Sequence, residues 1–509
     1  MSFQPPDRFN IAQYFLTQRI EEGRGERTCL RTDAGDFSYA DVDRLANRYA
    51  NLLREAGVRP EERVLLALPD TADYVGALFG TLKLGGVVVM VNPQLQRSEV
   101  EYFFEYTRAS VAIVHAEVAG VFEEAAENSR MLREVIVVDG AGFADRLGAA
   151  WDVCEIYPTT PHDAAIWLFS GGTTGNPKAV VQSHRSFANT TECYGKQVIQ
   201  YSEDDITLSV PKLYFGYATG SNLLFPMAAG ASTALFADRC VTETLFQQIR
   251  KRRPTILINV PTMVNHMVTH ESAGDQDLSC LRVATSAGEA LPVELHERWN
   301  KLFGCELLDG LGTAEMWHIF ISNRPGDVRP GTLGVVVPGF EVRVCDDDGG
   351  ELPDGEVGTM WVRGDSRAIG YWQHYEKTRH AFRGKWFVSS DMIQKNADGS
   401  INYCGRADDM LKVSGKWVSP KEVENCVLGH PGVGEVAVVG IVDANGLTKP
   451  HAFVLANPGE ALTESELQAF VKERLAPHKY PRKVVILDEL PRTHLGKVDR
   501  GKLRALAGS

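Results

Sequence analysis

The feature that most limits the fold is a regular alternation of short apolar runs with longer helical patterns. It begins near the N-terminus, where apolar runs at 64–68, 87–91 and 111–114 alternate with helical patterns at 72–84 and 98–108. A helical pattern at 242–252 and apolar runs at 256–259 and 281–285 repeat the alternation later in the chain. Strands that alternate with helices of this length form βαβ units, whose strands are parallel. The sequence therefore predicts an α/β fold with largely parallel sheets.

The pattern changes twice in the C-terminal part of the chain. From about residue 331, short apolar runs and turns replace the alternation, which predicts an antiparallel β subdomain. Further on, helix-start signals at Ser419 and Thr463 lie between apolar runs. At 509 residues the chain exceeds what one core usually supports. We therefore expect a large N-terminal domain over residues 1–407, which includes the β subdomain, and a small α+β C-terminal domain over 408–509.

Composition and charge exclude several classes of function. The net charge of −13 argues against a nucleic-acid partner, which needs a basic face. The nine cysteines include no CxxC pair, so we expect neither a disulfide framework nor a zinc site, and a reducing, cytoplasmic location fits them. The N-terminus lacks a signal-peptide pattern, and Lys83 interrupts the most apolar window, so no membrane partner is expected. His266 and His270 have helical ligand spacing, but nothing else indicates a metal cluster.

A glycine-rich segment follows the apolar run at 164–169. It has the sequence Ser170-Gly171-Gly172-Thr173-Thr174-Gly175-Asn176-Pro177-Lys178. Glycine lets backbone N–H groups turn toward a ligand, threonine hydroxyls add donors, and Lys178 adds a mobile positive charge. It is not a Walker A loop, because Pro177 precedes the lysine and Ala179 follows it. The segment suits a polyphosphate, although a plain surface loop can have the same composition.

The order of several motifs resembles that of the adenylate-forming superfamily of acyl-CoA synthetases, luciferases and peptide-synthetase adenylation domains. The resemblance covers essentially the whole chain. Two runs resemble the benzoate-CoA ligase branch in particular, namely Pro211-Lys212-Leu213-Tyr214-Phe215-Gly216-Tyr217-Ala218-Thr219-Gly220 and Asp309-Gly310-Leu311-Gly312-Thr313-Ala314-Glu315-Met316-Trp317-His318-Ile319-Phe320. The resemblance implies an AMP-forming aryl-CoA ligase, an acid–thiol ligase that uses ATP, Mg²⁺ and coenzyme A.

The resemblance also implies roles for individual residues. Glu315 would bind Mg²⁺, a hard cation that prefers carboxylate and phosphate oxygens. Asp391 would accept both ribose hydroxyls, Arg406 would lie near ribose and phosphate, and Lys497 would bridge the carboxylate and the α-phosphate. The implied catalytic residues are Thr173, Glu315 and Lys497. The implied cofactor-binding residues are Ser170, Gly171, Gly172, Thr174, Gly175, Lys178, Gly288, Glu289, Asp309, Gly310, Leu311, Gly312, Thr313, Asp391 and Arg406.

Three further groups of residues follow from the resemblance. Asp408 matches the hinge about which a mobile C-terminal domain rotates between the two half-reactions. The segment that borders the pantetheine tunnel for CoA in relatives matches Ser414, Gly415, Lys416 and Trp417. The pocket for the acid is expected from Phe215, Gly216, Tyr217, Gly288, Gly312, His318 and Ile319.

The expected acid pocket combines aromatic walls with small residues, which suits a flat ring better than an alkyl chain. Gly216, where benzoate ligases often have alanine, would leave room for a ring substituent, and His318 could hydrogen-bond an ortho amino or hydroxyl group. The expected partner is therefore a small aromatic carboxylic acid, either benzoate or a substituted benzoate, with 2-aminobenzoate favoured among the latter. The resemblance to the family is the sole reason to expect a homodimer.

Two alternatives stay open at the level of sequence. A stand-alone aryl-acid adenylating enzyme would load a carrier protein in place of CoA. A catalytically silent nucleotide-binding protein would use the glycine segment as a sensor or scaffold. Departures from the family pattern at Gly171, Leu311 and Ala314 are the reason that the silent protein stays open, and Ser390 is a milder departure. The joint presence of four polar residues opposes it, namely Glu315, Asp391, Arg406 and Lys497.

Overall fold

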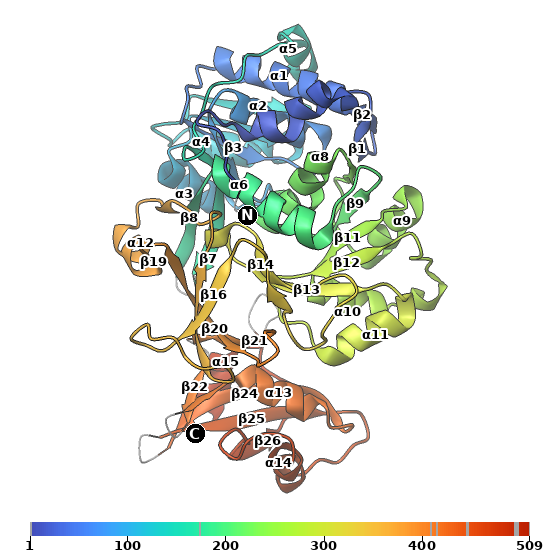
Figure 1. The fold of residues 1–509 in the computed structure, drawn as a ribbon, viewed down its shortest axis with the longest axis vertical. Helices are drawn as coiled ribbons and strands as arrows, with labels where there is room; N and C mark the ends of the chain where they lie inside the picture. The colour runs from blue at the N-terminus through green and yellow to red at the C-terminus, as the bar shows by residue number, and fades with distance from the viewer. Residues whose placement is uncertain are drawn as a thin grey trace. The chain divides into compact units, whose positions relative to one another are not determined.

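The structure is a computed structural model that describes residues 3–172, 175–407, 410–413, 416–443, 447–492 and 498–507 (Figure 1). Its contacts divide the chain into two compact units. Unit 1 comprises Met1–Val342 and Val362–Phe387, and unit 2 comprises Arg343–Trp361 and Val388–Ser509. In the described part of the chain, every helix is too short or too polar to cross a membrane.

The first sheet of unit 1 has seven strands in the order β18-β8-β7-β4-β3-β5-β6. They are β3 (Arg63–Ala67), β4 (Val87–Met90), β5 (Val111–His115), β6 (Glu134–Val138), β7 (Ala164–Gly172), β8 (Gly175–Ser183) and β18 (Gly370–Tyr371). The five strands from β3 to β7 are parallel, while β8 and β18 are antiparallel to their neighbours. Three apolar runs of the predicted alternation are thus parallel strands, as expected.

The second sheet of unit 1 has nine strands in the order β15-β14-β13-β12-β11-β9-β10-β1-β2. They are β1 (Thr28–Thr32), β2 (Gly35–Ser38), β9 (Ile206–Ser209), β10 (Ser232–Ala234), β11 (Ile256–Asn259), β12 (Val283–Ser286), β13 (Leu307–Gly312), β14 (Ile319–Ser322) and β15 (Val335–Val336). From β1 to β13 the neighbours are parallel, whereas β2, β14 and β15 are antiparallel. The predicted α/β class is therefore confirmed.

Helices lie between the strands of unit 1 (Figure 1). They are α1 (Tyr39–Glu55), α2 (Ala72–Lys83), α3 (Arg97–Thr107), α4 (Ala119–Ala126), α5 (Phe143–Ala149), α6 (His184–Thr190), α7 (Gly216–Ala218), α8 (Phe225–Ala229), α9 (Thr242–Arg252), α10 (Pro261–Thr269), α11 (Val293–Phe303) and α12 (Tyr375–Ala381). Buried side chains of α3 and α4, such as Phe104 and Phe122, pack on Leu65 and Val89 of the first sheet. This packing fixes the sheet that carries the glycine-rich segment.

The pairing of α1 with α2 shows how local sequence sets these helices. Ser38 begins α1 with a capping box, in which its Oγ accepts the Asp41 N–H at 3.1 Å and the Asp41 carboxylate accepts the Ser38 N–H at 2.9 Å. On α2, a Cβ at Gly80 would lie 2.8 Å from the carbonyl oxygen of Ala46. Only glycine therefore allows the two helices to approach this closely.

A five-stranded sheet and the C-terminal elements complete the fold. The sheet contains β16 (Glu341–Cys345), β17 (Val357–Arg363), β20 (Trp386–Lys395) and β19 (Phe382–Arg383), with β21 (Ile401–Arg406) paired to β20. After it come β22 (Leu411–Val413), β23 (Lys416–Val418), α13 (Pro420–Leu428), β24 (Val433–Val442), β25 (Thr448–Ala456), α14 (Glu464–Lys472), β26 (Lys483–Ile486) and α15 (Arg500–Ala507). Valines of these elements form a separate core, which explains why this part is a small α+β body.

Candidate active site

The described residues of the glycine-rich segment belong to two antiparallel strands, the end of β7 and the start of β8. β7 and β8 pair antiparallel, with Ser170 opposite Lys178 and Gly172 opposite Gly175. Because β7 is also parallel to β4, its carboxyl end lies at the edge where open α/β sheets bind ligands. A Cβ at Gly171 would meet no described atom within 4 Å. The backbone is therefore open to a ligand at this point.

Two tyrosines of α3 hold β8, the second of these strands. The Tyr102 hydroxyl donates to the Pro177 carbonyl at 2.7 Å. The Tyr106 hydroxyl accepts the Ala179 N–H at 3.1 Å and donates to the Trp372 carbonyl at 2.8 Å. The two rings stack with their centroids 5.1 Å apart. Sequence reasoning missed both residues, although their i, i+4 spacing on a predicted helix placed them on one face.

Tyr371 connects two residues that sequence reasoning predicted separately. Its hydroxyl donates to Glu315 Oε1 at 2.7 Å, and the ammonium of Lys178 lies 3.9 Å from the centroid of its ring. Glu315 is 6% exposed, so its carboxylate is held inside the protein. The structure thus brings together the predicted phosphate-binding lysine and the predicted metal-binding carboxylate. Tyr371 carried no local sequence signal, because it is distant from both along the chain.

The carboxyl ends of β12 and β13 carry further predicted nucleotide-binding residues. Gly288 has a φ of +87°, and a Cβ there would meet no described atom within 4 Å. Glu289 is engaged with the start of α10, because its Oε2 accepts from the Thr262 hydroxyl at 2.7 Å. Asp309 is buried on β13, and this burial raises the pKa of its carboxyl well above the usual value.

Residues 310–313 lead from β13 toward Glu315, and two of them, Gly310 and Gly312, have no room for a side chain. A Cβ at Gly310 would lie 2.9 Å from a carbonyl oxygen of β14, and one at Gly312 would lie 2.5 Å from the His318 carbonyl oxygen. Leu311 lies between the two glycines and pairs with β14. The Thr313 hydroxyl accepts a backbone N–H of the following turn. The strand pair therefore places Gly312 directly against His318.

The buried His318 packs against the half-buried Tyr217, with their ring centroids 5.4 Å apart. His318 Nε2 lies 3.1 Å from the Tyr217 carbonyl oxygen and 3.2 Å from Ser221 Oγ, and the rings of His318 and Phe225 have centroids 4.8 Å apart. Burial lowers the pKa of His318 to about 3, so the imidazole is neutral at physiological pH. Since Nε2 faces a carbonyl oxygen, it carries the proton and Nδ1 is an acceptor. No described residue hydrogen-bonds Nδ1.

The other predicted residues of the acid pocket lie on both sides of this pair. Phe215 is 53% exposed at the start of α7, and Ile319 is buried at the start of β14. The Tyr217 hydroxyl lies 2.6 Å from the Thr285 hydroxyl, which ties α7 to β12. A Cβ at Gly216 would lie 3.1 Å from a methyl carbon of Leu168. This contact is tighter than an ordinary van der Waals contact, so Leu168 already lies where we expected room for a ring substituent beside Gly216.

Asp391 and Arg406, both in unit 2, are brought together by strand pairing. They are directly opposite each other on β20 and β21. The buried Asp391 carboxylate accepts from the Ser389 hydroxyl at 2.6 Å and from the Tyr403 hydroxyl at 3.3 Å. The Arg406 guanidinium lies 3.5 Å from Asp391 Oδ1 and donates to the Ser390 hydroxyl at 2.5 Å. Ser390, a departure from the family pattern, is thus a partner of the arginine.

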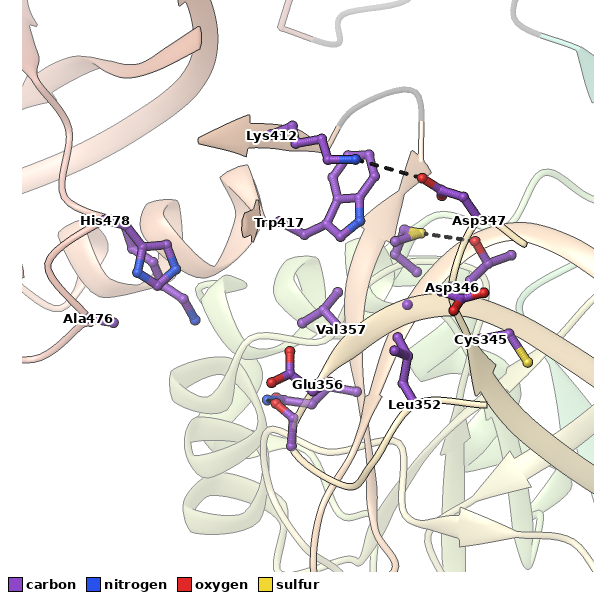
Figure 2. Close-up of a pocket in the computed structure, with 16 residues that line it drawn as sticks. Cys345, Asp346, Asp347, Leu352, Glu356, Val357, Lys412, Trp417, Ala476 and His478 are labelled. Atoms are coloured by element: carbon purple, nitrogen blue, oxygen red, sulfur yellow. Dashed lines mark hydrogen bonds and ion pairs between the residues drawn. The ribbon is translucent and has the colours of Figure 1, made fainter. Parts of the chain in front are cut away.

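Trp417 lies in a pocket of about 460 Å³ within unit 2 (Figure 2). The Lys412 ammonium lies 5.0 Å from the centroid of the indole ring and 3.7 Å from Asp347 Oδ2. His478 lines the same pocket from the segment after α14. Of the segment predicted to meet CoA, Trp417 is the member whose side chain is described, and it lies against open space.

Several predicted residues lie outside the described residues, namely Thr173, Thr174, Asp408, Ser414, Gly415 and Lys497, and for Lys416 only the backbone is described. Among the described residues no group of three or more His, Cys, Asp or Glu side chains could hold a metal ion. His270 hydrogen-bonds Glu243 at 3.0 Å and Ser272 at 2.9 Å, so both nitrogens of its ring have partners within the protein. A single carboxylate such as Glu315 suits a cation that is held mainly by substrate phosphates and water.

The comparisons with known proteins agree with this geometry. The family model of AMP-binding enzymes matches residues 17–372, and that of the AMP-binding enzyme C-terminal domain matches residues 422–497. The chain is 39% identical to the benzoate–CoA ligase of Thauera aromatica over 508 residues, which cover 98% of this chain and 96% of that protein.

Two solved structures also match over nearly the whole chain. One is the anthranilate CoA ligase AuaEII in complex with anthranoyl-AMP, with a TM-score of 0.89, 37% identity and coverage of 99% and 98% of the two chains. The other is a benzoate CoA ligase from Burkholderia xenovorans LB400, with a TM-score of 0.85, 39% identity and coverage of 97% and 100%. These matches confirm the resemblance that the sequence motifs indicated, including its branch.

Proposed function

The chain belongs to the family of AMP-binding enzymes, and from this premise we propose that it is an ATP- and Mg²⁺-dependent aryl-CoA ligase. The predicted class of enzyme, an AMP-forming acid–thiol ligase, is confirmed by relatives of 37–39% identity that span almost the full chain. The acid is benzoate or a substituted benzoate, and 2-aminobenzoate is favoured among the substituted ones. ATP and CoA are the co-substrates.

The observation that carries the choice of acid is the fixed, neutral imidazole of His318. Its Nε2 is anchored to the Tyr217 carbonyl, and its Nδ1 is a buried acceptor that no described residue pairs. An unpaired buried acceptor costs about 1–3 kcal/mol, and an ortho amino or hydroxyl group on the ring can donate to it. The aromatic rings of Tyr217 and Phe225 beside it suit a flat acid. An anthranilate CoA ligase is among the matched structures.

The reaction proceeds in two steps that balance without a further reactant. A carboxylate oxygen of the acid attacks the α-phosphorus of ATP, and the bond to pyrophosphate breaks. The sulfur of CoA then attacks the acyl carbon, its proton is lost, and AMP leaves with the electrons of the anhydride bond. Glu315 would hold Mg²⁺ together with the substrate phosphates, and the ion would supply positive charge to the triphosphate.

The chain's own residues supply position and charge to these steps. The backbone N–H groups of the glycine-rich segment and the Lys178 ammonium bind phosphate oxygens. The N–H groups present the positive ends of their dipoles, and the ammonium carries a full positive charge. Asp391 accepts the ribose hydroxyls, and Arg406, which lies 3.5 Å from it, helps to orient that carboxylate. Lys497 bridges the acid carboxylate and the α-phosphate and so lowers the barrier to adenylation.

Acid-dependent exchange of labelled pyrophosphate into ATP tests this proposal. The panel contains benzoate, 2-aminobenzoate, hydroxybenzoates, cinnamates, hexanoate and phenylalanine. We expect strong exchange with benzoate and 2-aminobenzoate. Exchange with hexanoate or phenylalanine alone would exclude the aryl pocket but keep the mechanism, and no exchange with any acid would favour a silent nucleotide-binding protein. Acylation of CoA against acylation of a phosphopantetheinylated carrier protein then separates the ligase from a carrier-loading enzyme.

A further inference from the structure

We propose that Tyr371 is a positioning residue that holds the phosphate-binding lysine and the metal-binding carboxylate in their working places. The inference rests on the roles proposed above for Lys178 and Glu315. Tyr371 contacts both of them, the lysine through the face of its ring and the carboxylate through its hydroxyl. It therefore acts on the triphosphate site through two other residues.

Strand pairing fixes where Tyr371 lies. β18 adds to β8 as an antiparallel neighbour, with Tyr371 opposite Val180. Backbone bonds on both sides extend this pairing, because Ile369 N–H donates to Val181 at 2.9 Å and Trp372 N–H donates to Ala179 at 3.0 Å. Side chains two residues apart on a strand share a face, so Lys178 and Val180 point to the same side of β8. A diagonal neighbour at this spacing is within reach of an aromatic ring, which explains the 3.9 Å contact.

The hydroxyl of Tyr371 orients the carboxylate of Glu315. A hydrogen bond to an ionised group is short and strong, and this one measures 2.7 Å between two buried side chains. It occupies Oε1 and leaves Oε2 as the oxygen that a cation could use. The ring of Tyr371 is itself braced by an edge contact with Phe382 at a centroid distance of 5.4 Å. The carboxylate therefore has one orientation before any ligand binds.

Tyr371 also keeps two opposite charges apart. Lys178 and Glu315, both described by the structure, form no ion pair with each other, and the tyrosine contacts each of them. In a site with little water, a direct ion pair between these two groups would be strongly favoured. Such a pair would compete with the phosphates for the lysine and with Mg²⁺ for the carboxylate. The ring face and the hydroxyl satisfy both groups without neutralising either.

Two variants separate the hydroxyl from the ring. Y371F keeps the face against Lys178 and removes the bond to Glu315, whereas Y371L removes both contacts. Y49F is the matched control, because the Tyr49 hydroxyl also donates to a carboxylate, Asp73 Oδ1, at 2.7 Å. Calorimetric titration with ATP is run across a series of Mg²⁺ concentrations and also with EDTA, so the readout is binding rather than turnover.

We expect Y371F to raise the Mg²⁺ concentration for half-maximal enhancement of ATP binding about tenfold. Its affinity for ATP in EDTA should equal that of the wild type, and Y371L should weaken that affinity about threefold or more as well. Y49F should change neither value. A Y371F variant with wild-type Mg²⁺ dependence would overturn the inference. So would equal losses of ATP affinity in EDTA for Y371F and Y371L. A wild type that fails to bind ATP would instead overturn the proposed function and this inference together.

Discussion

The Asp391 carboxylate and the Arg406 guanidinium lie 3.5 Å apart across the β20–β21 pair. Sequence motifs predicted both residues near the ribose of the nucleotide, but one at a time. The structure shows them as direct cross-strand neighbours. Their proposed tasks are therefore coupled, because any change in the arginine alters the charge that faces the carboxylate.

Replacing Asp391 with asparagine should weaken ATP binding. The amide would offer a ribose hydroxyl one uncharged acceptor in place of an ionised carboxylate. Hydrogen bonds to charged groups contribute about 1.5–3 kcal/mol, so D391N should raise the KM for ATP about 10- to 100-fold. The KM for the acid should stay within about twofold.

D277N is the control for that experiment, because Asp277 also pairs with an arginine, Arg253, at 2.7 Å. It should leave the KM for ATP unchanged. Equal effects of D391N on the KM for ATP and on the KM for the acid would argue against ribose recognition.

Replacing His318 with phenylalanine should reduce the preference for an ortho-substituted acid. The change keeps a ring between Tyr217 and Phe225 but removes the Nδ1 acceptor. The ratio of kcat/KM for 2-aminobenzoate to that for benzoate should fall about tenfold, the effect of one lost hydrogen bond. S221A removes a neighbour of Nε2 and keeps Nδ1, so its ratio should match the wild type. A ratio that is the same in H318F and the wild type would contradict the proposed role of Nδ1.

Low pH should destabilise the folded protein partly through His184. This histidine is buried, its Nδ1 accepts the Ile11 N–H at 3.2 Å, and burial lowers its pKa to about 3. Below pH 6.5 the unfolded chain takes up a proton that the folded chain refuses, so the free energy of unfolding falls as the pH drops from 6.5 toward 3.

The variant H184N should lose this contribution. Urea unfolding between pH 6.5 and pH 4 should show a slope that is smaller than that of the wild type by about 1.4 kcal/mol per pH unit. H380N replaces an exposed histidine of α12 and should keep the slope of the wild type. A slope that H184N leaves unchanged would mean that His184 titrates normally in the folded protein.

Lys497 should matter for adenylation and much less for thioester formation. In the proposed mechanism its charge bridges the acid and the α-phosphate in the first step alone. K497A should therefore slow pyrophosphate exchange by ~10²-fold or more. With preformed acyl-AMP, single-turnover formation of the CoA thioester should stay close to the wild-type rate. A loss of the same size in both assays would contradict this division of roles.

Local patterns predicted the elements well, because their signals lie within each element. The helix expected at 242–252 is Thr242–Arg252, and the strand expected at 256–259 is Ile256–Asn259. The helix-start signal at Thr463 is confirmed by α14, which begins at Glu464. The composition of the glycine-rich segment did not reveal that β7 pairs with β4 and that β8 pairs with β18.

The candidate site could be predicted only where a motif names its residues. Glu315 and Lys178 were found in this way, but the residue that joins them was not. Tyr371 reaches them through a strand pairing between segments about 190 residues apart, and no spacing rule along the chain records such a contact. The tautomer of His318 was equally out of reach, because it depends on which carbonyl its Nε2 meets in the fold.

The pairing of β18 with β8 has a consequence for the order in which the protein is made. Chains grow from the N-terminus and their domains fold as units during synthesis. A growing chain that has not yet reached Gly370–Tyr371 would leave β8 as an uncovered edge and would lack the brace on Lys178. Nucleotide could then stabilise the nascent protein only late, after nearly three quarters of the chain had left the ribosome.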